Sequence, residues 1–242
     1  MPIYKIADLN ISIEPIFENV KKRLLPYISD SIVADFSVSA SMEQINKICS
    51  NPKHPCSPEN AENAIILTQI CRSVLDSYEG FFFHSSSIAI NNEAYVFTAL
   101  SGTGKSTHTA LWRKHFGDKA VMINDDKPII RKSNGQFYIF GTPWMGKSDI
   151  GNNLKVPVKA VYILRRAKNN SVIRVTPGEV FKELLEATLV PRDKTKMATL
   201  LELFDEFFTL TPLFILNCNI SDDAVLTAFN AVNNQEKGCD NK

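Results

Sequence analysis

Residues 99–107 read A-L-S-G-T-G-K-S-T and lie between a strand-like run and a helix-like run. The preceding run, 94–98, is β-branched and aromatic, and the following run, 105–116, contains no proline. Glycines at 102 and 104 allow successive backbone N–H groups to face an anion, and the positive end of a new helix adds to the attraction. The segment therefore predicts a strand, a loop that binds phosphate and a helix.

A second segment, 141–148, matches the strict pattern G-x-x-x-x-G-K-[ST], whereas Ala99 occupies the first glycine position of 99–107. Backbone chemistry still favours the first segment. Pro143 has no N–H to offer a phosphate, and Trp144 is bulky where backbone must approach closely. Alanine costs little at the first position if its φ is negative. We assign the nucleotide to 99–107 and interpret the second match as a chance one.

Each residue of the first loop has an expected role. Lys105 would reach the β- and γ-phosphates, and the Ser106 hydroxyl would ligate a phosphate-bound Mg²⁺. The expected ligands are ATP and Mg²⁺. The residues expected to bind the nucleotide are Ser101, Gly102, Thr103, Gly104, Lys105, Ser106 and Thr107.

Composition narrows the class of partner. The 242 residues carry a formal net charge of +1, which gives no reason to expect a nucleic acid or a membrane as partner. No apolar stretch approaches the roughly 20 residues that span a bilayer. The first residues lack the plan of a signal peptide, and the five cysteines include no C-x-x-C pair. We expect a cytoplasmic protein with reduced thiols and a small-molecule, peptide or protein substrate.

The chain reads as an α/β protein in three parts. The first, 1–80, is a mixed α/β region, the second, 81–233, is the main α/β region, and 234–242 is a disordered tail. Strands are expected at 4–13, 32–38, 81–90, 95–98, 120–123, 129–131, 137–140, 158–164 and 213–216. Helices are expected at 17–25, 58–78, 105–116, 177–188, 194–208 and 222–232, with Met197, Leu200, Leu201, Phe204 and Phe208 as one apolar stripe.

Two hairpin signals surround the glycine-rich loop. Asn91-Asn92 separates the two strands before it, and Asn134-Gly135 separates two strands after it. Ordinary dinucleotide-binding folds use parallel strands that are joined by helices. We therefore expect a mixed sheet.

Candidate catalytic groups flank the loop in the sequence. Asp125 and Asp126 directly follow an apolar strand, and neighbouring side chains of an extended chain point to opposite faces. One could hold Mg²⁺ while the other faces an acceptor hydroxyl. The alternative is a simple turn after a strand, where Asp is also favoured. His84, which precedes three serines, is weak evidence by itself, and Arg165, Arg166 and Arg192 are surface candidates when taken singly.

The order of these segments resembles the HPr kinase/phosphorylase family. Its members carry a histidine before the loop, an S-G-x-G-K-[ST] loop and an aspartate pair, which match His84, 101–106 and Asp125-Asp126. The loop is also similar to that of ATP-dependent phosphoenolpyruvate carboxykinases, which share a related fold. The resemblance implies a mixed-sheet kinase fold of this type, with the N-terminal region packed on the kinase core.

What the resemblance implies is a kinase that transfers a phosphoryl group from ATP to a hydroxyl, in particular a serine that is free or part of a peptide or protein. Lys105 would contact the phosphates and His84 would lie near the transferred group. Asp125 and Asp126 would be metal ligand and catalytic base, in an order that stays open. The alternatives are a nucleotide-binding module without transferase activity, which needs only the loop, and a simple ATPase or phosphatase.

The segment 141–153 has two interpretations. Its glycines, adjacent asparagines and exposed-looking Trp144 indicate a loop that closes over bound substrates and excludes water. Alternatively, it is a long connection in which Trp144 packs on the core. Substrate contacts are expected on this segment and near Arg192.

Overall fold

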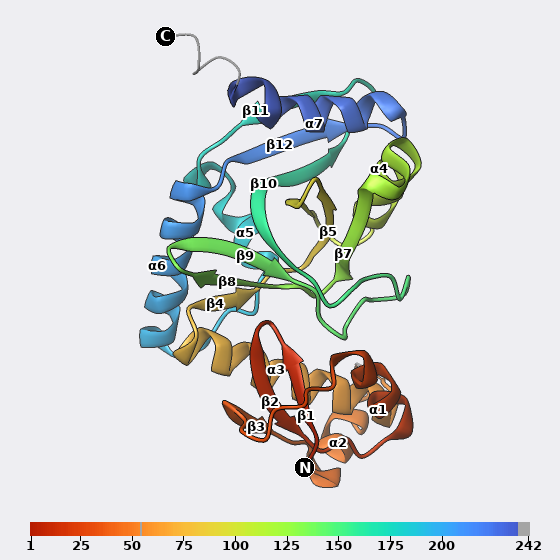
Figure 1. Cartoon of the computed structure of the whole chain (residues 1–242), viewed down its shortest axis with the longest axis vertical. Coiled ribbons are helices and arrows are strands. Elements are labelled where there is room, and N and C mark those ends of the chain that lie inside the picture. Colours follow the sequence, from red (N-terminus) through yellow and green to blue (C-terminus); the bar gives the residue numbers. More distant parts are fainter. Residues whose placement is uncertain (54, 237–242) are drawn as a thin grey trace.

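The computed structural model describes residues 1–53 and 55–236, which form a mixed α/β fold with two β-sheets (Figure 1). The strands are β1 (Ile3–Ile6), β2 (Leu9–Ile13), β3 (Phe36–Val38), β4 (Gly80–Phe82), β5 (Ser85–Ile90), β6 (Glu93–Thr98), β7 (Ala120–Asp126), β8 (Ile129–Ser133), β9 (Gln136–Phe140), β10 (Lys155–Arg166), β11 (Ser171–Arg174) and β12 (Leu213–Cys218). The α-helices are α1 (Glu18–Leu24), α2 (Met42–Cys49), α3 (Pro58–Ser77), α4 (Lys105–Phe116), α5 (Phe181–Glu186), α6 (Lys194–Leu210) and α7 (Asp222–Glu236).

The larger sheet is mixed, as the hairpin signals predict. Its order is β4-β8-β9-β10-β6-β5-β7, with β12 also beside β10 and β11 beside β12. The long strand β10 joins its two parts, because its start pairs antiparallel with β9 and its later residues pair parallel with β6. The register shifts between Val158 and Ala160, and such a bulge bends a strand. Figure 1 shows β10 curving between the two parts.

Strand direction gathers the candidate residues at one edge of this sheet. Strands β12, β10 and β6 run parallel, while β5 runs antiparallel to both β6 and β7. The carboxyl ends of four strands and the amino end of β5 therefore lie at the same edge. His84 precedes β5, the glycine-rich loop follows β6, and Asp125-Asp126 ends β7. Ligands of open α/β sheets bind outside this kind of edge.

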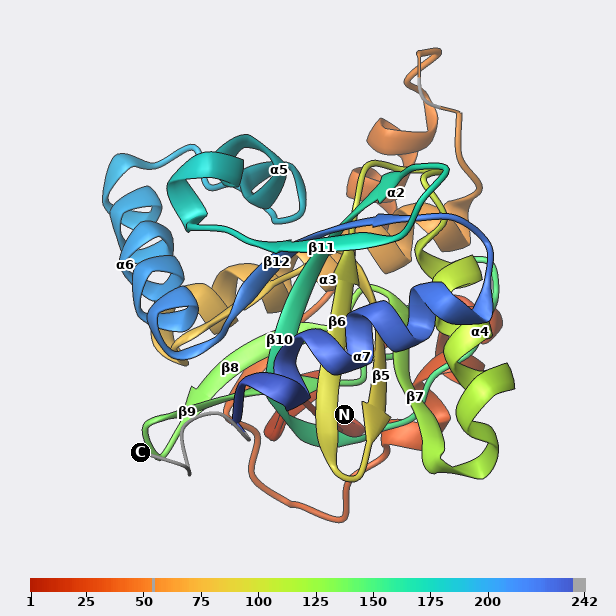
Figure 2. The ribbon, with the colours of Figure 1, turned by 90° about the horizontal axis from the view of Figure 1, so that it is seen from above.

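Helices cover both faces of the part of the sheet that contains β6 and β10. Tyr95 and Tyr162 pack with Trp112 of α4 and with α7, which lies across the strands in Figure 2. The neighbouring residues Val96 and Val161 point to the opposite face and join a core that includes α5 and α6. Alternate side chains of one strand thus serve two cores, as the twofold periodicity of a strand requires.

The N-terminal region shares its core with the rest of the chain. Its sheet, in the order β1-β2-β3, packs with α1 and α3. The same cluster includes Ile129, Phe140 and Trp144, which come from the main region. The helix predicted at 58–78 is confirmed as α3, and Ser57 caps it by accepting a hydrogen bond from the Asn60 N–H at 3.3 Å.

Several boundaries differ from the sequence-based expectation. The strand expected at 4–13 is the hairpin β1–β2, because Ala7 and Asp8 adopt φ values of 53° and 59° without a sequence signal for a turn. The strand expected at 81–90 is interrupted before His84, and α2 and β11 were not expected. In α6 the buried stripe is Leu200, Leu203, Phe204, Phe207 and Phe208, so Met197 and Leu201 lie at its margin.

The predicted start of the disordered tail, at residue 234, is wrong. Helix α7 continues to Glu236, beyond the expected end at residue 232. The asparagines at 233 and 234 have only moderate helix propensity, but a helix that has already formed can extend through such residues. Residues 237–242 lie outside the described part of the chain.

Candidate functional site

The glycine-rich loop connects β6 to α4, which confirms the predicted strand before it and helix after it. Gly102 and Gly104 have φ values of 79° and 124°, which residues with a Cβ rarely adopt. Gly104 is the N-cap of α4 and brings no side-chain acceptor to the first turn. The N–H groups of that turn have no partner within the helix, and together they can receive an anion.

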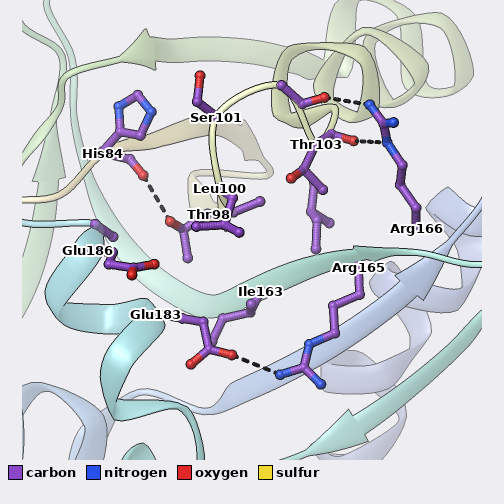
Figure 3. A pocket seen from close by; sticks show the side chains of 14 residues that line it. His84, Thr98, Leu100, Ser101, Thr103, Ile163, Arg165, Arg166, Glu183 and Glu186 are labelled. Atoms are coloured by element: carbon purple, nitrogen blue, oxygen red, sulfur yellow. Dashed lines mark hydrogen bonds and ion pairs between the residues drawn. The ribbon is translucent and has the colours of Figure 1, made fainter.

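Arg166 stabilises this loop through hydrogen bonds to its carbonyl groups. Its Nε donates to the carbonyl oxygen of Thr103 at 3.0 Å, and its Nη2 donates to that of Gly102 (Figure 3). Arg166 ends β10, which runs parallel to β6, so its side chain starts at the edge of the sheet where the loop begins. Satisfying these carbonyl groups fixes the loop. The Thr103 N–H is also used within the loop, since it donates to the Leu100 carbonyl oxygen at 3.2 Å, so a ligand would be received by the N–H groups at the start of α4.

Lys105 lies between the loop and the two aspartates. Its Nζ donates to the carbonyl oxygen of Ala99 at 3.1 Å. Burial lowers the pKa of the Lys105 ammonium, and the charges of Asp126 and Asp125 partly offset this effect. The ammonium therefore lies in a partly desolvated position near both carboxylates. A phosphate group placed there would meet a cation with little competing water.

Asp126 is held by two neighbours. Its carboxylate accepts from His84 Nδ1 at 2.9 Å and also pairs with the Lys127 ammonium. Burial would raise the pKa of the Asp126 carboxyl, but the hydrogen bonds and charges of His84 and Lys127 outweigh it and lower that pKa. Asp126 thus stays ionised, with its charge shared between two partners.

This contact also fixes which nitrogen of His84 carries the hydrogen. Both partners of Nδ1, the Asp126 carboxylate and the Asp126 carbonyl oxygen at 3.1 Å, accept hydrogen bonds and cannot donate. Nδ1 must therefore be the donor, so the neutral ring presents Nε2 as an acceptor. The side chain is 31% exposed, and His84 lines two pockets, so a ligand can reach this ring.

Asp125 differs from its neighbour. It is 8% exposed, and its Oδ2 accepts a hydrogen bond from the Ser148 hydroxyl. Its Oδ1 is buried and has no hydrogen-bond partner among the described residues. A buried carboxylate oxygen without a partner is costly, which indicates that a donor or a cation completes this site when ligands bind.

The loop from Gly141 to Gly151 lies against the end of β7. A Cβ on Gly141 would come within 1.8 Å of the Asn152 carbonyl oxygen, and one on Gly146 within 2.9 Å of the Asp126 Cβ. The Asn124 side chain donates to the Thr142 carbonyl oxygen at 2.9 Å. Close backbone packing thus accounts for glycines that also produce the second motif match, and no helix follows that match.

Trp144 is buried, which argues against the interpretation of 141–153 as a loop that closes over substrates with an exposed tryptophan. It is only 4% exposed and packs in the N-terminal core. Its Nε1 donates to the Asn63 side chain of α3 at 2.9 Å. Of the two interpretations of this segment, the structure favours a connection that packs on the core.

Three pockets surround the glycine-rich loop. The main cleft, of about 820 Å³, brings together His84, both aspartates and every residue of 101–107 except Thr103. The side pocket, of about 620 Å³, shares His84, Ser101 and Gly102 with it and contains the ion pair of Arg165 with Glu183 (Figure 3). The helix-tip pocket, of about 480 Å³, lies beside the first turns of α4. Arg192 lines another pocket, which shares no lining residue with these three.

The sequence analysis assigned no role in the site to three of its residues. Arg166 read as a surface residue, although its place at the end of a buried strand beside the loop strand could have identified it. Lys127 follows the aspartates directly and could have been read as their counter-ion. Ser148 was interpreted as part of a chance motif match, because its contact with Asp125 depends on how the loop folds back along β7.

The oxygen ligands at this edge suit Mg²⁺ better than a softer metal. Among the described residues, no group of three or more His, Cys, Asp or Glu side chains is arranged to hold a metal ion. The available ligands are the Ser106 hydroxyl, the two aspartates and the phosphates of a substrate. Magnesium is usually bound in this way, with one or two carboxylates and substrate oxygens, and the free Asp125 Oδ1 fits this role.

Comparisons with known proteins give little beyond this geometry. No protein-family model and no curated protein matches the sequence. Among solved structures, the HPr(Ser) kinase/phosphatase from Coxiella burnetii is similar, with a TM-score of 0.35 and 12% sequence identity, over 64% of this chain and 97% of that one. A likeness this loose carries no argument about function. Within the described residues, no helix has the length and apolar character needed to cross a membrane.

Proposed function

We propose that this protein is an ATP-dependent kinase that transfers the γ-phosphoryl group to a hydroxyl, in particular that of a serine. The observation that carries the proposal is the meeting of three groups in the main cleft. These are the glycine-rich loop with Lys105, the pair of His84 with Asp126, and Asp125 with its unpartnered buried oxygen. A module that only binds a nucleotide would need the first group alone.

The arrangement of the pockets supports one orientation of the bound nucleotide. Gly104 and Thr107 line both the main cleft and the helix-tip pocket, so the two spaces meet over the start of α4. The helix-tip pocket contains Leu111, Leu164 and Ile220, which suit the flat apolar face of a nucleobase. We place the nucleoside there and the γ-phosphate in the main cleft, beside Lys105.

The remaining groups have distinct roles in this proposal. Ser106 and Asp125 would hold Mg²⁺, whose chemistry here is to neutralise charge on the phosphate oxygens, while Asp126 stays paired with His84 and Lys127. Lys105 and the N–H groups of the loop stabilise the charge that develops on the transferred group. The wall of the main cleft away from the loop is left for the acceptor.

Phosphoryl transfer then needs one proton acceptor. The acceptor's hydroxyl oxygen attacks the γ-phosphorus, the bond from that phosphorus to the β,γ-bridging oxygen breaks, and ADP leaves. The hydroxyl proton passes to Nε2 of His84, which Asp126 orients through Nδ1. The ionised Asp126 stabilises the imidazolium that forms.

Nucleotide titrations test which loop binds ATP. Lys105→Ala removes a charge-assisted contact worth about 1.5–3 kcal/mol, so ATP affinity should fall at least tenfold. Lys147→Ala provides the matched control, since it removes the lysine of the second motif and should leave ATP affinity nearly intact. The reverse ranking of the two variants would disprove our assignment.

A transfer assay separates a kinase from the alternatives. With radiolabelled ATP, a kinase labels a serine acceptor, and His84→Ala lowers that rate while ATP binding persists. ATP binding without labelling of any acceptor would indicate a binding module. Release of inorganic phosphate at a rate that no acceptor changes would indicate an ATPase.

A further inference from the structure

The second glycine-lysine motif is not accounted for by nucleotide binding, yet it lies in the main cleft. Gly146, Lys147 and Ser148 all line this cleft. Packing explains the glycine and the bond to Asp125 explains the serine. The lysine has no structural role of this kind, because it is exposed and forms no hydrogen bond or ion pair with the described residues.

The neighbours of Lys147 place its backbone next to the reacting groups. Gly146 packs so tightly that an added Cβ would meet the Asp126 Cβ, and the Ser148 hydroxyl bonds to Asp125. Each neighbour is one residue away, and consecutive Cα atoms are about 3.8 Å apart. Because loop 141–151 is anchored along β7, this position is fixed before any ligand binds.

Arg23 adds a second cation to the same cleft from the N-terminal region. It belongs to the last turn of α1, is half-buried, and forms no hydrogen bond or ion pair with the described residues. The other two lysines of the cleft are engaged, Lys105 with the loop and Lys127 with Asp126. The two aspartates are the only acidic residues among the described residues that line the cleft.

We infer that Lys147 and Arg23 bind a carboxylate of the phosphoryl acceptor. This inference rests on the proposed kinase function and names its substrate class, a hydroxy acid or a serine whose own carboxylate is free. In the proposed placement the nucleotide extends from the cleft toward the helix-tip pocket, so Arg23 and Lys147, which line the cleft and not that pocket, are left for the acceptor. Because the residues on either side of Lys147 contact the two aspartates, we expect the hydroxyl and the carboxylate of the acceptor to be only a few bonds apart.

Paired acceptors test this substrate class on the full-length protein. With radiolabelled ATP, we compare L-serine with L-serinamide and glycerate with glycerol, since each pair differs in the carboxylate. A tripeptide that ends in serine, used as the free acid and as the amide, tests whether a peptide can supply the carboxylate. In each pair that reacts, the acid should be used at least ten times more efficiently than its neutral partner.

Variants connect this preference to the two cations. Lys147→Met should raise KM for the acid acceptor roughly tenfold or more, leave KM for ATP within about twofold, and reduce the difference between acid and amide. Arg23→Gln should act in the same direction, and Arg23→Lys should restore part of the loss. Lys22→Met is the matched control, because Lys22 is exposed on the same helix and does not line the cleft.

Three results would overturn the inference. The first is equal use of acid and neutral acceptors, and the second is transfer to a neutral acceptor without transfer to any acid. The third is a Lys147→Met variant that loses ATP affinity rather than acceptor affinity, since these cations would then bind the nucleotide. Failure of the kinase proposal is recognised separately, because ATP would then not bind, Lys105→Ala would not weaken ATP binding, or neither acid nor neutral acceptors would be labelled.

Discussion

At the scale of single residues, two adjacent aspartates have different surroundings. Asp126 is tied to His84 and Lys127, while Asp125 keeps one buried oxygen without a partner. The alternation of side chains along β7 turns them to different neighbours, which the sequence-based argument anticipated. That argument left open which one binds the metal and which one takes part in proton transfer. The contacts suggest an order, with the metal on the carboxylate that still has a free oxygen.

Asparagine substitutions test this order. Asp125→Asn removes the charge at the free oxygen, so the Mg²⁺-dependent part of ATP binding should be lost together with transfer. Asp126→Asn should keep Mg²⁺-dependent binding but slow transfer by about 10²–10⁴-fold, because His84 loses the anion that orients it. Calorimetry of ATP binding with and without Mg²⁺, beside transfer assays, checks both. Transfer at wild-type rates in both variants would leave the pair as a simple turn.

At the scale of elements, helix α4 combines an exposed tip with a buried body. Its first turn faces the loop, while His108 and Trp112 are buried beneath it. The Trp112 Nε1 donates to His108 Nε2 at 3.0 Å, so the imidazole must be neutral at that nitrogen. His108 Nδ1 has no partner among the described residues. Burial lowers the pKa of His108 to about 4.

This buried histidine predicts acid-induced destabilisation. Between pH 6.5 and pH 4 the unfolded chain binds a proton at residue 108 that the folded chain does not. The contribution of neutral His108 to the free energy of unfolding is therefore fully present above pH 6.5. It falls as the pH drops toward 4, by up to about 3 kcal/mol. His108→Gln keeps an acceptor for Trp112 but does not titrate. Urea unfolding at pH 7 and pH 4.5 should show a smaller loss for the variant, and an equal loss would contradict the argument.

At the scale of the whole molecule, local signals predicted the elements and strand direction assembled the site. Ser57-Pro58 predicted the start of α3 and Asn134-Gly135 predicted a hairpin, because helix capping and turn formation depend on residues that are neighbours in the sequence. Arg166 and Ser148 could not be identified in this way, since their contacts with Thr103 and Asp125 arise from segments far apart in the chain. The sequence left two interpretations of Trp144 open, because the residues that cover it come from α3, about 80 residues earlier.

The shared cores lead to a prediction about cooperativity. Trp144 packs in the N-terminal core, and Trp112 packs in the core beneath α4 and α7. A third core lies between them, because Ile129 and Ile130 are neighbours on β8 and point into different clusters. When one strand contributes side chains to two cores, loss of packing in one core also destabilises the other. We therefore expect the N-terminal region and the main region to unfold together.

The two tryptophans report on this directly. In the Trp112→Phe variant the fluorescence comes from Trp144 and reports on the N-terminal core. In the Trp144→Phe variant it comes from Trp112 and reports on the core beneath α4. Each variant should show one urea transition whose fluorescence midpoint coincides with its own midpoint by far-UV circular dichroism. Each substitution changes stability by its own amount, so the two midpoints are compared within each variant. A Trp144 signal that changes before the secondary structure of the same variant is lost would show that the N-terminal region unfolds independently.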